Sequence, residues 1–119
     1  MGMLPTIPWY ADVPATKDFR EAITKYGDIS KIDEPSMFLW TSLEFMRMGM
    51  EAGKITPTSS FADVAKALAA VKTNENGAIA DVSFTEGQPS PHIKCYFVDG
   101  FSDGKFTLPE GDKAQCLSS

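Results

Sequence analysis

His92 is the only histidine in this chain, and histidine is the side chain best suited to acid–base chemistry near neutral pH. A histidine base needs a carboxylate that orients its ring, and Asp81 or Asp99 could supply one from a neighbouring strand. No nucleophile motif accompanies this residue. We therefore expect that the protein is not an enzyme, and we keep His92 with Asp81 at the mouth of a pocket as the catalytic alternative.

Metal and cofactor motifs are missing from the sequence. Asp99 and Asp103 bracket a glycine-containing hexapeptide, but calcium loops need closely spaced oxygen ligands and a distal glutamate, which this segment lacks. Cys95 and Cys116 form no Cys-x-x-Cys pair and no cluster with histidine, which argues against zinc. We expect ordinary turn chemistry at Asp99 and Asp103, and neither a metal nor a cofactor.

The two cysteines are expected to be free. Cys95 lies among apolar residues of a predicted strand, whereas Cys116 lies in a polar tail. Two unpaired cysteines, together with an N-terminus that does not read as a signal peptide, favour a reducing compartment and predict a cytoplasmic location. No apolar run reaches the ~18 residues that span a bilayer, so we expect no membrane contact.

Negative charge is concentrated in the C-terminal part of the chain. Residues 73–119 carry seven acids and three lysines, a difference of −4 in a total net charge of −5. This distribution argues against nucleic acid, because phosphate backbones are bound by clustered lysine and arginine. It is compatible with a basic protein partner, which Asp99 and Asp103 would contact. A solvated acidic surface that keeps the protein in solution explains the same charges without a partner.

The densest apolar segment, residues 33–53, predicts one helix with both ends marked. Asp33 is a natural N-cap, Pro35 suits the first turn, and Gly53 suits a left-handed C-terminal position. A helix that is apolar over most of its girth lies at the centre of its domain or is covered by a partner. At about 100° per residue, one stripe of this helix is predicted to face the core: Leu39, Leu43, Met46 and Met50.

The remaining apolar residues of this helix are candidates for a contact surface. Met37 and Met48 lie together on another side, beside Phe45, and Trp40 falls within the narrow charged wedge. We therefore expect Trp40, Phe45 and Met48 to bind a partner. In the alternative, the helices and a curved sheet enclose an apolar cavity lined by Trp40, Phe45, Phe97 and methionines.

Hydrophobic periodicity changes from helical to alternating along the chain, which predicts an α+β fold with three N-terminal helices on one face of a small antiparallel sheet. We expect one domain over 1–119, with a three-stranded meander to which the N-terminal arm could add a fourth strand. The predicted elements are an extended, proline-rich arm over 1–14, helices over 17–26, 33–53 and 60–72, strands over 78–84, 92–98 and 105–108, and a frayed tail over 110–119.

These features predict a small, acidic, cytoplasmic interaction protein, such as an inhibitor, an immunity-type protein or an assembly factor that binds a basic partner. A structural subunit, including a homo-oligomer, differs from this mainly in oligomeric state. The rival hypothesis is a small-molecule-binding or lyase-type α+β domain. A deep enclosed pocket with a polar pair would favour the rival, and an exposed apolar patch would favour an interaction protein.

Overall fold

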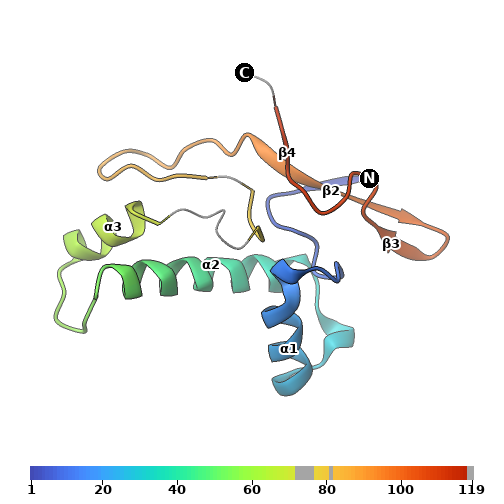
Figure 1. Cartoon of the computed structure of the whole chain (residues 1–119), viewed down its shortest axis with the longest axis horizontal. Helices are drawn as coiled ribbons and strands as arrows, with labels where there is room; N and C mark the ends of the chain where they lie inside the picture. Colours follow the sequence, from blue (N-terminus) through green and yellow to red (C-terminus); the bar gives the residue numbers. More distant parts are fainter. Residues whose placement is uncertain (72–76, 81, 118–119) are drawn as a thin grey trace.

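The computed structural model describes residues 1–71, 77–80 and 82–117 (Figure 1). Helices precede most of the strands along the chain, and all strand pairs are antiparallel, so the α+β class is confirmed. The elements in chain order are β1 (Gly2–Leu4), the short 3-10 turn η1 (Pro14–Thr16), α1 (Lys17–Tyr26), a second 3-10 turn η2 (Ile29–Lys31), α2 (Glu34–Ala52), α3 (Phe61–Ala69), β2 (Cys95–Ser102), β3 (Lys105–Thr107) and β4 (Gln115–Cys116).

The sheet is built around β2, which pairs with each of the other three strands. The N-terminal arm supplies β1, as expected, with Met3 opposite Val98. The β2–β3 hairpin turns at Asp103 and Gly104, so the turn expected at Asp103 is confirmed. The turn expected at Asp99 is wrong, because β2 begins later than predicted, at Cys95, and continues through Asp99 to Ser102. The predicted frayed tail is wrong at Gln115 and Cys116, because these residues pair with β2 as β4. The sheet is therefore not a meander, since three short strands share one long neighbour.

The strand predicted over 78–84 is not formed in the part of it that the structure describes. This segment and the arm make one isolated bridge, between Thr6 and Ile79. The amide of Ala80 donates to the carbonyl of Pro5, but Pro5 has no N–H with which to complete the pair. The alternation of apolar residues is real, but a proline-containing partner cannot continue the ladder.

The starts of α2 and α3 follow local capping signals, and the cap of α2 is the one predicted from the sequence. The Asp33 side chain accepts a hydrogen bond from the amide of Ser36 at the start of α2, and Ser60 and Asp63 form a reciprocal capping box at the start of α3. The left-handed conformation expected at Gly53 is wrong, because its φ is −80°. α3 ends at Ala69, earlier than predicted.

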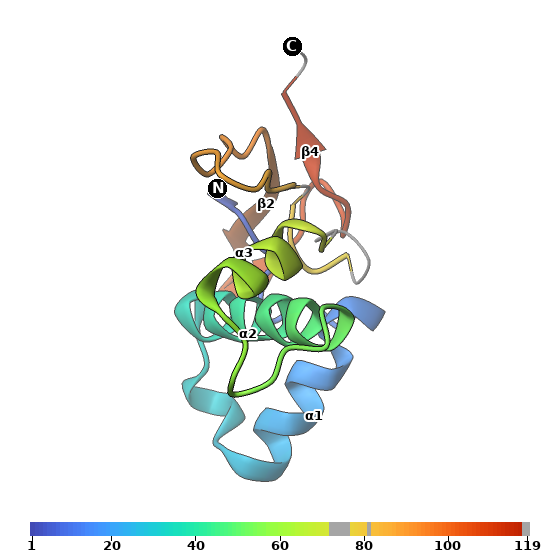
Figure 2. The ribbon, with the colours of Figure 1, turned by 90° about the vertical axis from the view of Figure 1, so that its left-hand side faces the viewer.

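The core lies where the arm, α1, the N-terminal half of α2 and β2 meet. Ile7 from the arm, Phe19 from α1, Met37 from α2 and Phe97 from β2 each expose 1% or less of their surface. The arm thus runs between the helices and the sheet. In Figure 1, α1 crosses α2 at its N-terminal end, while α3 packs beside the other end of α2. Figure 2 shows α3 on one side of α2 and α1 on the other.

The stripe predicted to face the core is instead exposed. Leu39 and Leu43 expose 60% and 55% of their surface, and Met46 and Met50 expose 46% and 43%. The buried face of α2 is the opposite one, which carries Met37 and Thr41. α2 is apolar on two faces, and the arm and β2 cover only one of them. Within the described residues, no helix or strand packs along the other.

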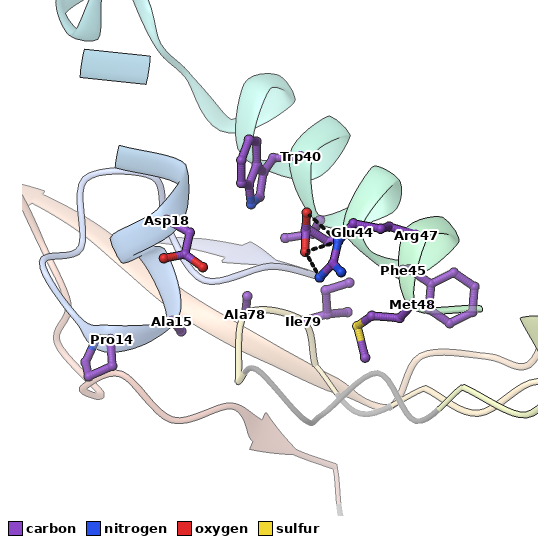
Figure 3. A pocket seen from close by; sticks show the side chains of 11 residues that line it. Pro14, Ala15, Asp18, Trp40, Glu44, Phe45, Arg47, Met48, Ala78 and Ile79 are labelled. Carbon is purple, nitrogen blue, oxygen red and sulfur yellow. Dashed lines mark hydrogen bonds and ion pairs between the residues drawn. The ribbon is translucent and has the colours of Figure 1, made fainter. Parts of the chain in front are cut away.

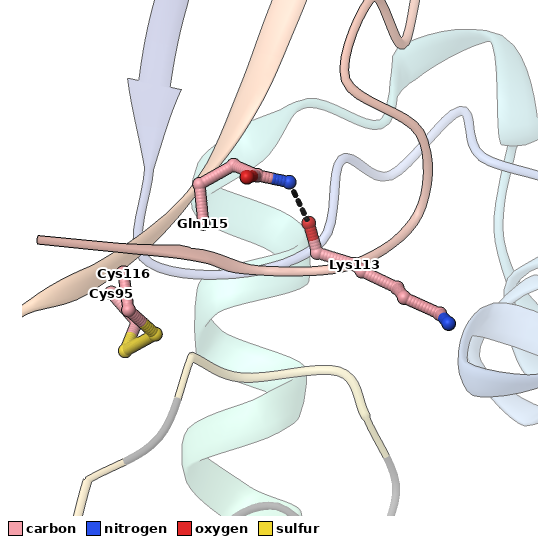
Figure 4. Close-up of a disulfide and its surroundings, with 4 residues drawn as sticks. All are labelled: Cys95, Lys113, Gln115 and Cys116. Atoms are coloured by element: carbon pink, nitrogen blue, oxygen red, sulfur yellow. Dashed lines mark hydrogen bonds between the residues drawn. A yellow bond between two sulfur atoms is a disulfide. The ribbon is translucent and has the colours of Figure 1, made fainter.

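The prediction of two free cysteines is also wrong. Cys95 and Cys116 form a disulfide, drawn in Figure 4, with 4.0 Å between their Cα atoms. Pairing of β4 with β2 places the two residues directly opposite each other, which is the geometry that brings cross-strand side chains together. The prediction failed because it treated the tail as unpaired.

No described helix is both long enough and apolar enough to cross a membrane.

A candidate protein-contact cleft on α2

A cleft of about 320 Å³ lies between α2 and the segment that leads into α1 (Figure 3). α2 forms one wall. The start of α1 and the short stretch 78–79 form the others, and the arm's bridge to Ile79 helps to hold that stretch in place. The lining residues are Pro14, Ala15, Asp18, Trp40, Thr41, Glu44, Phe45, Arg47, Met48, Ala78 and Ile79.

The cleft brings together the three apolar residues of α2 that were proposed as contact residues. Trp40, Phe45 and Met48 all line it and are all half-buried. The Trp40 ring packs edge-on against Phe19, with 5.7 Å between ring centroids, and Phe45 packs against Phe84 at 5.3 Å. These ring contacts hold the two aromatic side chains in place, so the apolar wall is formed before any partner arrives.

The charged residues at the cleft differ in whether they have an ionic partner. Arg47 binds the carboxylates of Glu44 at 2.7 Å and Glu51 at 2.9 Å, and these hydrogen bonds raise the pKa of the guanidinium above its ordinary value. Asp18 reaches the cleft from α1 and is exposed. Among the residues that the structure describes, no cation pairs with Asp18. The cleft therefore offers, beside an apolar wall, the Asp18 carboxylate, which has no cation partner in the described part of the chain.

Asp99 and Asp103, the acidic contact residues predicted from the sequence, do not lie at this cleft. Asp103 is exposed in the β2–β3 turn, with a φ of 51°. Asp99 pairs with Gly2 in the sheet, and its Oδ1 atom is buried without a hydrogen-bond partner among the described residues. The two aspartates thus differ in exposure. Neither of them lies beside Trp40, Phe45 and Met48.

Beneath the arm lies an acidic group that sequence reasoning missed. The Thr6 hydroxyl donates a hydrogen bond to Glu34 Oε1, whereas Oε2 is buried and has no partner among the described residues. Burial, together with the nearby charge of Asp99, raises the pKa of Glu34 to about 7. Burial, together with the charges of Asp99 and Glu34, raises the pKa of Tyr10 to about 12. No sequence spacing could have signalled this group, because it depends on the arm reaching β2.

The residues of the catalytic alternative are not assembled at the cleft. His92 is exposed in the segment before β2 and does not line the cleft, and Asp81 lies outside the described residues. Phe97, expected in the cavity wall, is in the core. In the described part of the chain, no three residues among histidine, cysteine, aspartate and glutamate gather as metal ligands would.

Comparison with protein-family models, curated proteins and solved structures finds no match to this chain. Function is therefore inferred from the geometry of the chain itself.

Proposed function

We propose that this protein is a small interaction module that binds a basic segment of a protein partner in the cleft on α2. One observation carries the proposal: the cleft combines a fixed apolar wall, made by Trp40, Phe45 and Met48, with the unpaired carboxylate of Asp18. Apolar and aromatic walls with a few placed polar groups are typical of binding sites. In this proposal the partner is a target that the module inhibits, or a protein whose assembly it assists.

A lysine or arginine side chain fits these groups chemically. Its aliphatic stem would pack on Met48 and Phe45, and its charged head would lie over the Trp40 ring and reach Asp18. The cation–π contact contributes roughly 0.5–2 kcal/mol. The acidic surplus of the whole chain, −5, would favour the approach of a basic partner.

Two variants of equal charge test this proposal. Asp18→Lys reverses the charge in the cleft, whereas Glu21→Lys reverses it three residues later on α1, outside the cleft and at an exposed site. Partners are captured from the source cells with the parent chain and with each variant, and their affinities are then measured. We expect Asp18→Lys to weaken binding about tenfold or more and Glu21→Lys to change it little. Equal capture by Asp18→Lys and the parent would contradict the proposal.

The volume of the cleft is also compatible with the binding of a small molecule. Its volume, about 320 Å³, is at the lower end of the ~300–1,000 Å³ range of ligand pockets. His92 is not at its mouth, so this alternative now rests on binding and not on catalysis. A ligand that shifts the melting temperature of the parent but not of a Met48→Lys variant would favour it.

The proposed cytoplasmic location rested on free cysteines. The Cys95–Cys116 disulfide is instead typical of an oxidising compartment. Fractionation of the source cells, with the redox state of these two cysteines trapped at lysis, tests the location.

A further inference from the structure

An exposed apolar stripe runs along the side of α2 that faces away from the core. It consists of Leu39, Leu43, Met46 and Met50 and is called the α2 stripe below. Each of these residues exposes between 43% and 60% of its surface. Single exposed apolar residues need no explanation, but four in a row on one helix form a patch.

The spacing of the α2 stripe is that of a helix-pairing seam. Its members are separated by four, three and four residues, so they repeat every seven residues. Two helices with this repeat pack side by side, because each side chain of one helix enters a gap between side chains of the other. A helix that only lies on its own core normally carries a wider apolar face in contact with that core.

A shallow groove runs along most of the stripe. It is lined by Leu43, Met46 and Met50, with Lys54 and Ile55 at its C-terminal end. Leu39 lies outside the groove, near the N-terminal end of α2, and is the most exposed member of the stripe at 60%. In a two-fold interface both copies use the same surface, so Leu39 of one copy can contact the groove of the other.

We propose that the α2 stripe is a two-fold, antiparallel interface between two copies of this chain. Leu39 of each copy enters the groove of the other, beside Met50, while Leu43 meets Met46 at the centre. Antiparallel packing also keeps the bulky parts of the two copies apart. α1 and the sheet lie toward the N-terminal end of α2 (Figure 1), so parallel helices would bring two sheets and two α1 helices to the same end.

Charge along the edge of the stripe favours a second copy over a strongly charged partner. The charged residues that line the groove beside the stripe are Arg47, Glu51 and Lys54. Arg47 and Glu51 already pair with each other within one copy, 2.9 Å apart. The lysine is then the one charge in the groove without a partner among the described residues. A surface with so little unpaired charge suits the apolar stripe of a second copy better than a strongly charged partner.

The buried area is sufficient for a specific pair. From the exposed fractions, the stripe offers roughly 400 Å² of accessible surface per copy, and the pair about 800 Å². Side chains at the edge bring the total to about the 1,000 Å² that a specific interface needs. The inference is independent of the proposed cleft function, because no stripe residue lines the cleft and the groove shares only Arg47 with it.

The test is the mass of the full chain in solution, measured by light scattering and sedimentation over a concentration series. Leu43→Glu places a charge at the centre of the stripe, and Met46→Lys does the same with the opposite sign. Phe61→Glu is the matched control, because Phe61 is 88% exposed on α3 and lies outside the stripe. We expect the parent and Phe61→Glu to form dimers, and either stripe variant to raise the dimer dissociation constant at least about tenfold with unchanged circular dichroism.

The antiparallel direction of the two α2 helices is tested by oxidising mixtures of Leu39→Cys and Met50→Cys chains. We expect the mixed Leu39→Cys–Met50→Cys product to exceed both symmetric products, since position 39 of one copy lies against position 50 of the other. A predominant symmetric Leu39→Cys product would overturn the antiparallel arrangement. A parent that stays monomeric, a dimer that survives both stripe variants, or a different protein occupying the stripe would overturn the proposal itself.

Discussion

Met37 and Met46 lie nine residues apart on α2, which is half a turn around the helix, and they meet opposite surroundings. Met37 is fully buried against the arm and β2, whereas Met46 is 46% exposed. The side chains are identical, so composition cannot tell them apart. What differs is which neighbours the tertiary fold brings to each side of the helix.

Truncation of Met37 to alanine should cost about 2–5 kcal/mol of unfolding free energy, because it leaves a cavity in a closely packed core. Chemical denaturation of the variant and the parent measures the loss. Met3→Ala is the control, since Met3 is 71% exposed on β1. A loss at Met37 no larger than at Met3 would mean that the core is not where the structure places it.

Stability should fall as the pH rises through neutrality because of Glu34. The ordinary pKa of this carboxyl is 4.5, and burial raises it to about 7 in the folded chain. The folded state therefore holds the proton more tightly, so this contribution is fully present below about 4.5 and is lost as the pH rises through about 7. Melting temperatures of Glu34→Gln should show a smaller decrease between pH 5 and 8 than those of the parent. The exposed Glu86→Gln should behave like the parent.

At the residue scale, the sequence was informative where the controlling contact is local. Asp33 caps α2 through the amide of a residue three positions away, and this cap was predicted. Glu34 and Asp99 are 65 positions apart and become neighbours only through the arm. Phe45 and Met48 lie close together by helical spacing, whereas Trp40 lies in the charged wedge and Asp18 comes from another helix. All four meet in one cleft only because the start of α1 and the stretch 78–79 close it.

The contact between α2 and α3 depends on glycines. A methyl group added at Gly53 would meet the Cβ of Ala67 well inside van der Waals contact. Gly53→Ala should therefore destabilise the protein by about 1–3 kcal/mol, although alanine is the better helix former. Gly27→Ala at the end of α1 is the control, because its nearest contact is an ordinary 3.4 Å. Urea denaturation of both variants makes the comparison, and equal stabilities would argue against close packing of α3 on α2.

The disulfide should contribute about 3 kcal/mol, since it closes a loop whose ends are 21 positions apart. Thiol counting on the denatured, unreduced chain should find no free thiol. The double variant Cys95→Ser/Cys116→Ser should unfold at a lower denaturant concentration, by an amount similar to that caused by reducing the parent. Two free thiols in protein isolated under non-reducing conditions would contradict the pairing.

At the element scale, helices were predicted more accurately than strands. α1 and α2 form where predicted, because helical periodicity is a property of each segment, and the cap of α2 is its own neighbour Asp33. Strand formation needs a partner, and the residues at 78–80 find one only in an arm interrupted by Pro5 and Pro8. β4 was missed for the opposite reason. Its two residues carry no strand signal, and pairing with β2 determines their structure.

The whole molecule is flat and open, measuring 51 × 41 × 19 Å. Its radius of gyration, 15.7 Å, exceeds the ~13.5 Å expected of a compact chain of this length. Small-angle scattering from the Leu43→Glu variant, at concentrations where it is monomeric, should give a value near 16 Å. A value near 13.5 Å would mean that the stripe folds back onto its own chain.

Pairing of Gly2–Leu4 with Phe97–Asp99 also constrains the order of events during synthesis. A ribosome adds roughly 5–20 residues per second, so the arm waits several seconds for its strand partner to be made. α1 and α2 are complete well before that, and their core-facing side chains lack the cover of Phe97 until β2 arrives. A newly made chain therefore passes through a period in which neither apolar face of α2 is fully covered, and a chaperone that recognises apolar helices would meet it then.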